Sequence, residues 1–136
     1  MKLLAYEVDK RSFLGVLNED ETWVYPVSAA GMEYRSMKDL IREAGPSEME
    51  MLDYISKKMP GDVTGAASVE EIKVVSPIAE PDQDIICLGI NYMDHAKESA
   101  RFKKEEFSKP EKAIYFSKRV NRTNDPDGII PAHKNL

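Results

Sequence analysis

The sequence predicts an α+β protein, in which a small N-terminal β-meander with two helices is followed by the beginning of a second domain. Three observations support this prediction. Short segments rich in aromatic and β-branched residues open the chain, two amphipathic segments with helix-start and helix-stop signals follow, and isolated strand-like segments alternate with prolines afterwards. We expect the first domain to comprise residues 1–70 and the second to comprise residues 71–136.

Strands are expected where β-branched and aromatic residues lie between turn signals. In the first domain these segments are residues 3–8, 13–17 and 22–27, joined by the polar turns 9–12 and 18–21. In the second domain they are residues 71–75, 85–88 and 113–117. The segment 84–88 has the composition of a buried strand, and the proline-containing residues 123–136 are expected to form an extended loop.

Two helices are expected between residues 36 and 61. Ser36 is a suitable N-cap for the first, which should end at Gly45-Pro46. Its apolar positions are Met37, Leu40, Ile41 and Ala44. The second should begin at Ser47, with Glu50 completing a capping box, and stop at Pro60-Gly61. Its apolar positions are Met49, Leu52, Ile55 and Met59. Residues 62–68 are rich in small and turn-forming residues and are the expected linker between the domains.

The composition argues against two classes of function. The chain of 136 residues has 19 Lys and Arg against 24 Asp and Glu, a net charge of -5, whereas nucleic-acid binding requires clustered cations. No apolar run approaches the ~20 residues of a membrane span, and the N-terminus does not resemble a signal peptide. Cys87 is the single cysteine and cannot form an internal disulfide. We therefore expect a cytoplasmic protein that binds neither nucleic acid nor membrane.

The residues expected to carry chemistry follow the strand 85–88. Gly89 ends the strand, and His95 and Glu98 come soon after it. If this segment is helical, His95 and Glu98 lie at positions i and i+3 and share one face. A carboxylate beside a histidine orients the ring and stabilises its protonated form, which is the arrangement of general-base catalysis.

Spacing alone favours a simpler explanation of the same two residues. A His and a Glu three residues apart most often form an exposed helix pair, which stabilises the helix by only about 0.2–0.5 kcal/mol. His133, the only other histidine, lies in the terminal loop, where a structural explanation is favoured more strongly.

Three segments resemble, in the same order, the fumarylacetoacetate hydrolase family. The first has Pro77-Ile78, then Pro81, then the residues IICLGINYMDHAKE at 85–98, where the family has P-I-x-x-P and then I-x-C-x-G-x-N-Y-x-D-H-x-x-E. The second is PEKAIYFSK at 110–118, which is similar to P-x-x-P-x-x-F-x-K in its first proline, its phenylalanine and its lysine. The third is DGIIP at 127–131, which resembles D-x-I-x-x-P with one residue fewer before the proline.

The resemblance implies a role for each matching residue. His95 and Glu98 correspond to a catalytic dyad that activates a water or transfers a proton. Asn91 and Tyr92 correspond to residues that shape the floor of the substrate pocket, and Lys118 corresponds to a lysine that lines it. Residues 97–107 correspond to a mobile lid, which is compatible with a solvated helix. Cys87 is expected to be buried and inert rather than a nucleophile.

The resemblance also implies a metal, Mg²⁺ or Mn²⁺, in the complete enzyme. The family binds it through a Glu-x-Glu pair and a later Asp, and the pair would follow the segment that ends at Pro131. We therefore expect no metal site within these 136 residues and no activity from this chain alone. The pair Glu48 and Glu50 has the right spacing but lies in a predicted helix of the first domain, so we do not assign it. The second domain should be the first part of a mixed β-roll.

Three functional hypotheses follow. The first is the N-terminal part of a metal-dependent enzyme that acts on small oxo or β-keto dicarboxylic acids by C–C bond hydrolysis, decarboxylation or isomerisation. This enzyme would be a homodimer, or would be completed by a C-terminal chain. The second is a truncated, non-catalytic fragment or a partner-binding module. The third, a chance resemblance in an unrelated α+β protein, is disfavoured because three segments match in the same order.

Overall fold

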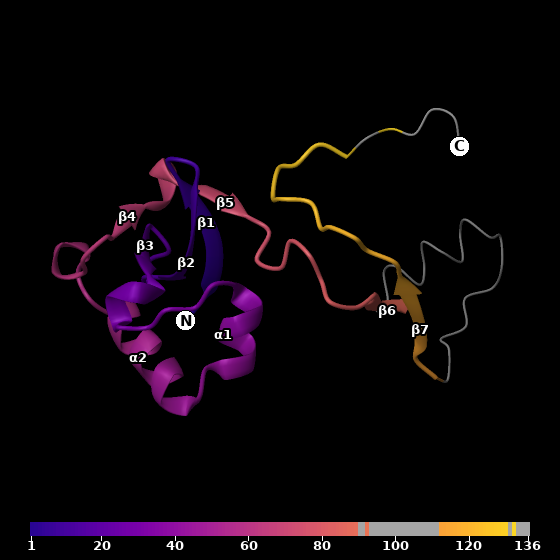
Figure 1. Ribbon diagram of the computed structural model, residues 1–136, viewed down its shortest axis with the longest axis horizontal. Helices are drawn as coiled ribbons and strands as arrows, with labels where there is room; N and C mark the ends of the chain where they lie inside the picture. The colour runs from indigo at the N-terminus through magenta and orange to yellow at the C-terminus, as the bar shows by residue number, and fades with distance from the viewer. Residues whose placement is uncertain (90–91, 93–111, 131, 133–136) are drawn as a thin grey trace. The chain divides into compact units, whose positions relative to one another are not determined.

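The computed structural model describes residues 1–89, 92, 112–130 and 132 and confirms the α+β class (Figure 1). The chain divides into two compact units. The N-terminal unit comprises Met1–Ala79 together with Thr123–Leu136, and the hairpin unit comprises Glu80–Arg122.

The N-terminal unit is built on one curled antiparallel sheet of five strands. The strands are β1 (Leu3–Val8), β2 (Arg11–Leu17), β3 (Trp23–Pro26), β4 (Ala67–Ser68) and β5 (Lys73–Val75). Their order is β4-β3-β2-β1-β5, so the predicted three-strand meander is confirmed and one short strand extends it on each side. Strand β5 belongs to this sheet although it lies beyond the expected boundary at residue 70, and the division into two domains stays a prediction.

The turn between β1 and β2 is tighter than the polar residues 9–12 indicated. Val8 pairs with Arg11, so only Asp9 and Lys10 form the loop. Both have positive φ angles, 50° and 64°, as a type I′ turn requires. The prediction of a longer turn was wrong because Arg11 and Ser12 are polar for another reason: they are exposed strand residues.

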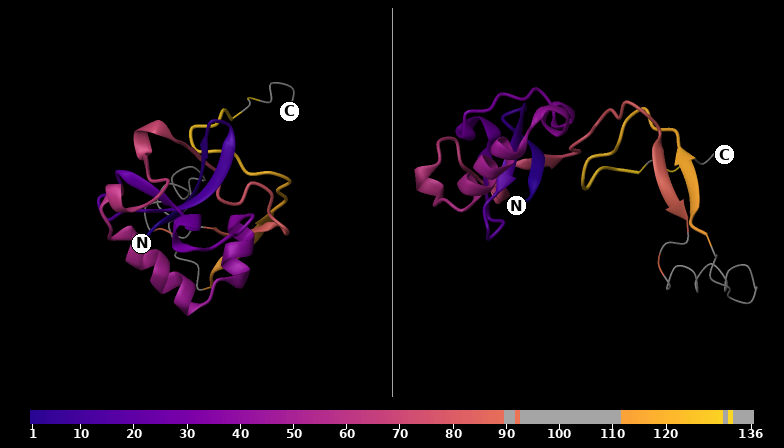
Figure 2. Two further views of the ribbon diagram at one scale, coloured as in Figure 1. Left: turned by 60° about the vertical axis from the view of Figure 1, so that its left-hand side comes forward. Right: turned by 90° about the horizontal axis from the view of Figure 1, so that it is seen from below.

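Both helices, α1 (Met37–Glu43) and α2 (Pro46–Ser56), lie on the same side of the sheet (Figures 1 and 2). Their apolar residues form one core with the inward-facing residues of β2 and β3. The buried members of this core are Val16, Tyr25, Val27, Met37, Leu40, Leu52, Ile55 and Val63. Local amphipathicity and burial therefore agree for most of the predicted helix positions.

Helix α1 begins as predicted. The Ser36 Oγ accepts a hydrogen bond from the Asp39 amide at 3.2 Å and donates one to the Asp39 carboxylate at 2.8 Å. Ile41, however, is 62% exposed, so its assignment to the buried face was wrong. The helix is only two turns long and contacts the core through Met37 and Leu40, and Ile41 lies about 100° further round the axis.

Helix α2 begins earlier than predicted. Gly45 is its N-cap and Pro46 its first residue, a position where the missing N–H of proline costs nothing. The carboxylate of Glu48 accepts the Gly45 amide at 3.1 Å, so Glu48 and not Glu50 completes the cap. The pair Gly45-Pro46 therefore starts the second helix as well as ending the first.

The end of α2 also differs from the prediction. The helix stops at Ser56, and Met59 is 70% exposed rather than part of the apolar stripe. Met59 precedes Pro60, which disfavours helical backbone at the residue before it, and Met59 is accordingly extended with φ -72° and ψ 145°.

The segment 62–68 is not a linker. Val63 is 8% exposed and belongs to the hydrophobic core, and Ala67 pairs with Val24 of β3. Small residues are used here because the chain passes close to the sheet: Gly65, at a φ of 77°, lies against Pro26. The linker prediction was wrong because it rested on composition alone.

Tyr25 connects the sheet to the end of α2. Its side chain is fully buried, and its hydroxyl donates a hydrogen bond to the Lys58 carbonyl at 2.7 Å. Burial raises the pKa of Tyr25 above its usual value of 10.0, and the negative charges of Asp20 and Asp62 raise it further. The tyrosine is thus held in its neutral, hydrogen-bonding form.

The other face of the sheet carries a second apolar cluster around Gly15. The Tyr6 ring, 2% exposed, stacks on Phe13 with 5.5 Å between ring centroids, and Val24 is fully buried beside it. A Cβ at Gly15 would meet the Val24 side chain, and it would come within 2.8 Å of the Tyr6 ring. Glycine is therefore required here so that the Tyr6 ring and the Val24 side chain can lie close to the strand.

The hairpin unit contains β6 (Ile85–Gly89) and β7 (Ile114–Lys118), which lie side by side in Figure 2. They pair in antiparallel register, with Ile85 opposite Lys118 and Gly89 opposite Ile114. Both strands were predicted.

Within the described part of the chain, residues 123–130 form neither helix nor strand, as expected for the terminal segment. No helix of the described residues is long and apolar enough to span a bilayer.

We predict that Gly15→Ala lowers the free energy of unfolding of the N-terminal unit by about 2 kcal/mol, because the added methyl forces Tyr6 and Val24 apart. Urea unfolding followed by the fluorescence of Trp23, the single tryptophan, measures this. Gly61→Ala is the matched control, since no atom lies within 4 Å of its Cβ position. Equal stability of the two variants would contradict the packing assigned to Gly15.

We further predict that Tyr25→Phe costs about 1–2 kcal/mol at pH 7, because the Lys58 carbonyl loses its hydrogen-bond donor. The pKa of Tyr25 is raised in the folded state, so this contribution is complete below the unfolded value of 10.0 and declines as the pH rises through the folded pKa. Urea titrations between pH 7 and 11 should therefore show the difference between wild type and variant shrinking above pH 10. A pH-independent difference would argue against the raised pKa.

Candidate functional site

The predicted site residues divide into two groups. Tyr92 and Lys118 are among the described residues. His95, Glu98, Asn91, the expected lid at 97–107 and His133 lie outside the described residues, and their roles stay predictions.

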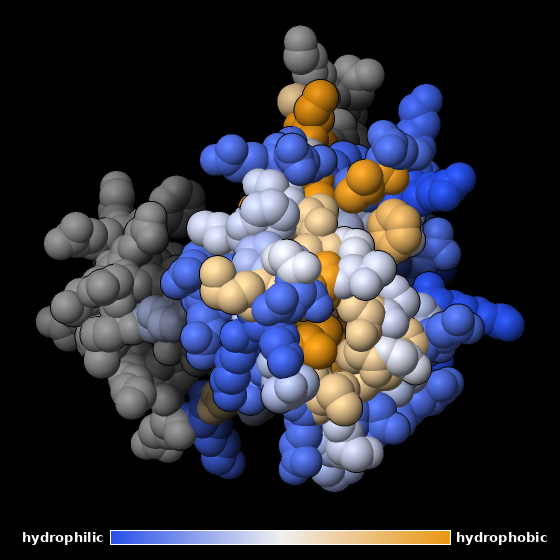
Figure 3. Space-filling view, turned by 90° about the vertical axis from the view of Figure 1, so that its left-hand side faces the viewer, coloured by the Kyte–Doolittle hydropathy of each residue, from blue (hydrophilic) through white to orange (hydrophobic). Residues whose placement is uncertain are grey.

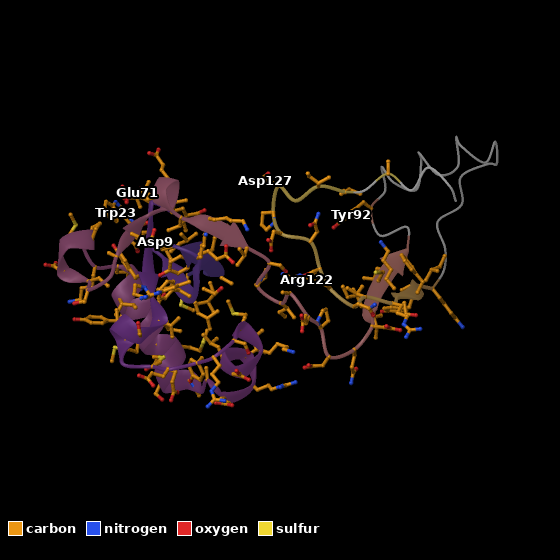
Figure 4. The ribbon with its side chains drawn as sticks, turned by 45° about the horizontal axis from the view of Figure 1, so that its top comes forward. Asp9, Trp23, Glu71, Tyr92, Arg122 and Asp127 are labelled. Atoms are coloured by element: carbon orange, nitrogen blue, oxygen red, sulfur yellow. The ribbon has the colours of Figure 1, made fainter. Side chains whose placement is uncertain are left out.

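Tyr92 and Lys118 are both exposed. Tyr92 comes three residues after the end of β6 and is 71% exposed (Figure 4). Lys118 ends β7 opposite Ile85, and its ammonium nitrogen lies 6.0 Å from the centre of the Phe116 ring. Lys118 is therefore at the opposite end of the hairpin from Gly89, about 13 Å away at ~3.3 Å per residue.

The hairpin presents apolar side chains on both of its faces. Residues that pair directly across the strands point to the same face. One face carries Ile85, Cys87, Ile114, Phe116 and Lys118, and the other carries Ile86, Leu88, Tyr115 and Ser117. Ile86 is 77% exposed and Tyr115 66%, so the strand with a buried composition is exposed in this structure. Cys87 is half-buried rather than buried. Among the described residues, β6 and β7 pair only with each other, so no further strand covers them.

Within the N-terminal unit, the residues that precede the hairpin unit in the chain are hydrogen-bonded to the residues that follow it. The Thr123 amide donates a hydrogen bond to the Ala79 carbonyl, and the Thr123 hydroxyl donates one to the Ile78 carbonyl, both at 2.8 Å. Since a hydroxyl has one hydrogen, the Ser76 hydroxyl must donate to Thr123 Oγ1. Ser76 is buried and Ile78 packs against the hydrophobic core, so this junction is anchored to the sheet.

Asp125 extends the same junction. Its Oδ1 accepts the Ser76 amide at 2.9 Å, and its Oδ2 lies 3.5 Å from the Lys73 ammonium. The residues after it form a tight turn, in which the Gly128 amide donates to the Asp125 carbonyl at 3.0 Å and Asp127 has a φ of 61° (Figure 4). Sequence analysis did not identify Ser76, Thr123 or Asp125. The available signal was the Asp-Pro-Asp-Gly turn, which marks where the chain reverses but not what it contacts.

The described residues do not fit a divalent cation. Among them, no group of three or more His, Cys, Asp or Glu side chains converges on one point. The carboxylate of Glu48 accepts hydrogen bonds from the Ser47 hydroxyl and the Gly45 amide, and these bonds lower its pKa. Glu48 is thus a helix cap.

A groove of about 680 Å³ opens on the N-terminal unit between the β1–β2 hairpin and the segment 64–67. The residues that line it are Tyr6, Val8, Asp9, Arg11, Phe13, Pro26, Ser28, Thr64, Gly65, Ala66 and Ala67. Figure 3 shows one side of the molecule, where apolar side chains gather in places among hydrophilic ones. Neither Tyr92 nor Lys118, the two predicted site residues that the structure describes, lines this groove.

Comparison with known proteins gives one informative match. No family model matches the chain. The chain is 28% identical over 146 aligned residues to oxaloacetate tautomerase YisK of Bacillus subtilis (strain 168). The alignment covers 100% of this chain and 47% of that relative, so the chain spans about half the length of the curated relative it matches.

We predict that the 136-residue chain binds Mg²⁺ no better than a generic acidic surface does, because hard cations require several converging oxygen ligands. Isothermal titration calorimetry with Mg²⁺ and Mn²⁺ tests this, and Glu48→Gln serves as a control for the helix-capping carboxylate. A stoichiometric site of micromolar affinity would contradict the prediction and would place ligands outside the described residues.

Proposed function

We propose that this chain is the N-terminal part of an enzyme of the fumarylacetoacetate hydrolase family that acts on small 2-oxo acids. The observation that carries the proposal is the alignment of the whole chain with an oxaloacetate tautomerase. The three motif segments at residues 77–98, 110–118 and 127–131 resemble the same family.

Tautomerisation is the reaction that the relative's name favours among those open to the family. In this reaction a base removes a proton from the carbon beside the keto group, and a proton is delivered to the keto oxygen, so no atom is gained or lost. We assign the proton transfer to His95, with Glu98 orienting the ring and stabilising its charged form. Lys118 and the pair Asn91 and Tyr92 would contact the substrate. A lysine is suited to this role because its ammonium pairs with a carboxylate of an oxo diacid.

A divalent metal belongs to the proposal by resemblance. When bound, it would polarise the keto oxygen as a Lewis acid. The described residues contain no site that fits it, so the proton transfer above is argued from this chain's own residues.

The exposed hairpin favours a second candidate, a partner-binding module. An isolated two-stranded hairpin is marginally stable in water, and both faces of β6–β7 carry large exposed apolar side chains. We propose that a separate, complementary C-terminal chain covers them in such a module. A hairpin covered by the remaining part of the same protein, or by a second copy of this chain, would contradict this candidate. Light scattering and intact mass of the purified natural protein distinguish these partners from one another.

We predict that His95→Ala and Glu98→Ala each lower kcat by about 10²- to 10⁴-fold, the usual contribution of a positioned acid–base group. The effects should be far from additive, because Glu98 acts through His95. The assay is steady-state kinetics on oxaloacetate and an acylpyruvate panel. It uses the full natural protein, or this chain co-expressed with the polypeptide that completes it.

His133→Ala is the matched control and should change kcat little, because the terminal loop gives it no carboxylate at useful spacing. Circular dichroism shows whether each variant is folded. A His95→Ala protein that keeps wild-type turnover of a substrate accepted by the parent would overturn the dyad assignment.

A further inference from the structure

We propose that Ser76, Thr123 and Asp125 form a clasp that fixes the two ends of residues 80–122, and that they are positioning residues for the site proposed above. This inference rests on the proposed function, because residues 80–122 contain the candidate dyad. The three residues themselves belong to the N-terminal unit and are all described by the structure.

The clasp joins the two points between which the hairpin unit is inserted. The chain leaves the N-terminal unit at Ala79 and returns at Thr123, and the Thr123 amide donates directly to the Ala79 carbonyl. Every residue between them is therefore part of one loop that is closed at its base. Closing a loop of this length restricts where its ends can lie, whatever the conformation of the loop itself.

The clasp contains side-chain hydrogen bonds as well as a backbone hydrogen bond. It therefore depends on which side chains occupy positions 76, 123 and 125. The Thr123 hydroxyl donates its single hydrogen to the Ile78 carbonyl and accepts a hydrogen bond from the Ser76 hydroxyl. The Asp125 carboxylate accepts the Ser76 amide, which is a charge-assisted bond. A valine at position 123 has the same shape as threonine but cannot make either hydroxyl bond.

The clasp is held on rigid structure. Ser76 directly follows β5, which pairs with β1, the strand next to the edge of the sheet. Ser76 is 8% exposed, so water can replace few of its hydrogen bonds and its polar atoms depend on these partners. The salt bridges of Lys73 to Glu7 and Asp125, each at 3.5 Å, lie at the surface and contribute little beside these hydrogen bonds.

The first test measures the clasp itself in the 136-residue chain by hydrogen–deuterium exchange. Thr123→Val should raise the exchange rates of the Ser76 and Thr123 amides at least tenfold, and Thr123→Ser, which keeps the hydroxyl, should restore them. Thr22→Val removes an exposed hydroxyl from the β2–β3 turn and should leave these two amides unchanged. Unchanged exchange in Thr123→Val would overturn the clasp.

The second test measures positioning in the full natural protein or the completed enzyme. Thr123→Val should lower kcat by about 10- to 100-fold with KM within twofold, because a small displacement of catalytic groups impairs the chemical step more than binding. Thr123→Ser should recover most of the loss. Wild-type kcat in a Thr123→Val protein with raised exchange would overturn the positioning role. Failure of the wild-type enzyme to turn over any 2-oxo acid would instead refute the proposed function, and the exchange result would still decide on the clasp.

Discussion

The fold of the N-terminal unit depends on how Tyr25 joins the sheet to the helices. Its ring fills the core between β3 and α2, and its hydroxyl satisfies the Lys58 carbonyl, which lies just beyond the last turn of α2. A buried phenol without a partner would cost free energy, so ring and hydroxyl together fix the helix against the sheet. With the sheet fixed, β1 can pair with β5 on its outer side, and the chain reaches Ser76 in a defined position. The hydrophobic core therefore determines where Ser76 lies, because β1 belongs to the fixed sheet and pairs with β5.

The predictable parts of this fold were those with a local cause. Strand periodicity and the Ser36 cap are set by residues within a few positions of each other, and both were identified. The errors arose where one residue type serves two purposes. Pro46 both interrupts one helix and starts the next, and Val63 stands in a turn-rich segment yet enters the core. Composition cannot separate these cases, because the deciding contact is made by a residue far away in the sequence.

The candidate site likewise combines features that are local in the sequence with contacts between distant residues. The strand that ends at Gly89 and the spacing of His95 and Glu98 are local features, and a sequence motif can carry them. The clasp is not local: Ser76 lies 47 residues from Thr123 and 49 from Asp125. Ser, Thr and Asp are also the commonest residues of turns and caps, so nothing in the sequence distinguishes these three from the others. Only the folded chain shows that they meet.

The hairpin places a geometric condition on the proposed enzyme. Lys118 and Gly89 point to the same face of β6–β7 but lie at opposite ends of it, with Cys87 and Phe116 between them. A small oxo acid cannot span the ~13 Å that separates these ends. Lys118 and the dyad can share one pocket only if the dyad lies nearer to Lys118 than Gly89 does, and this condition is part of the proposed function. The clasp bears on the condition because both strands of the hairpin unit lie between Ala79 and Thr123 in the chain.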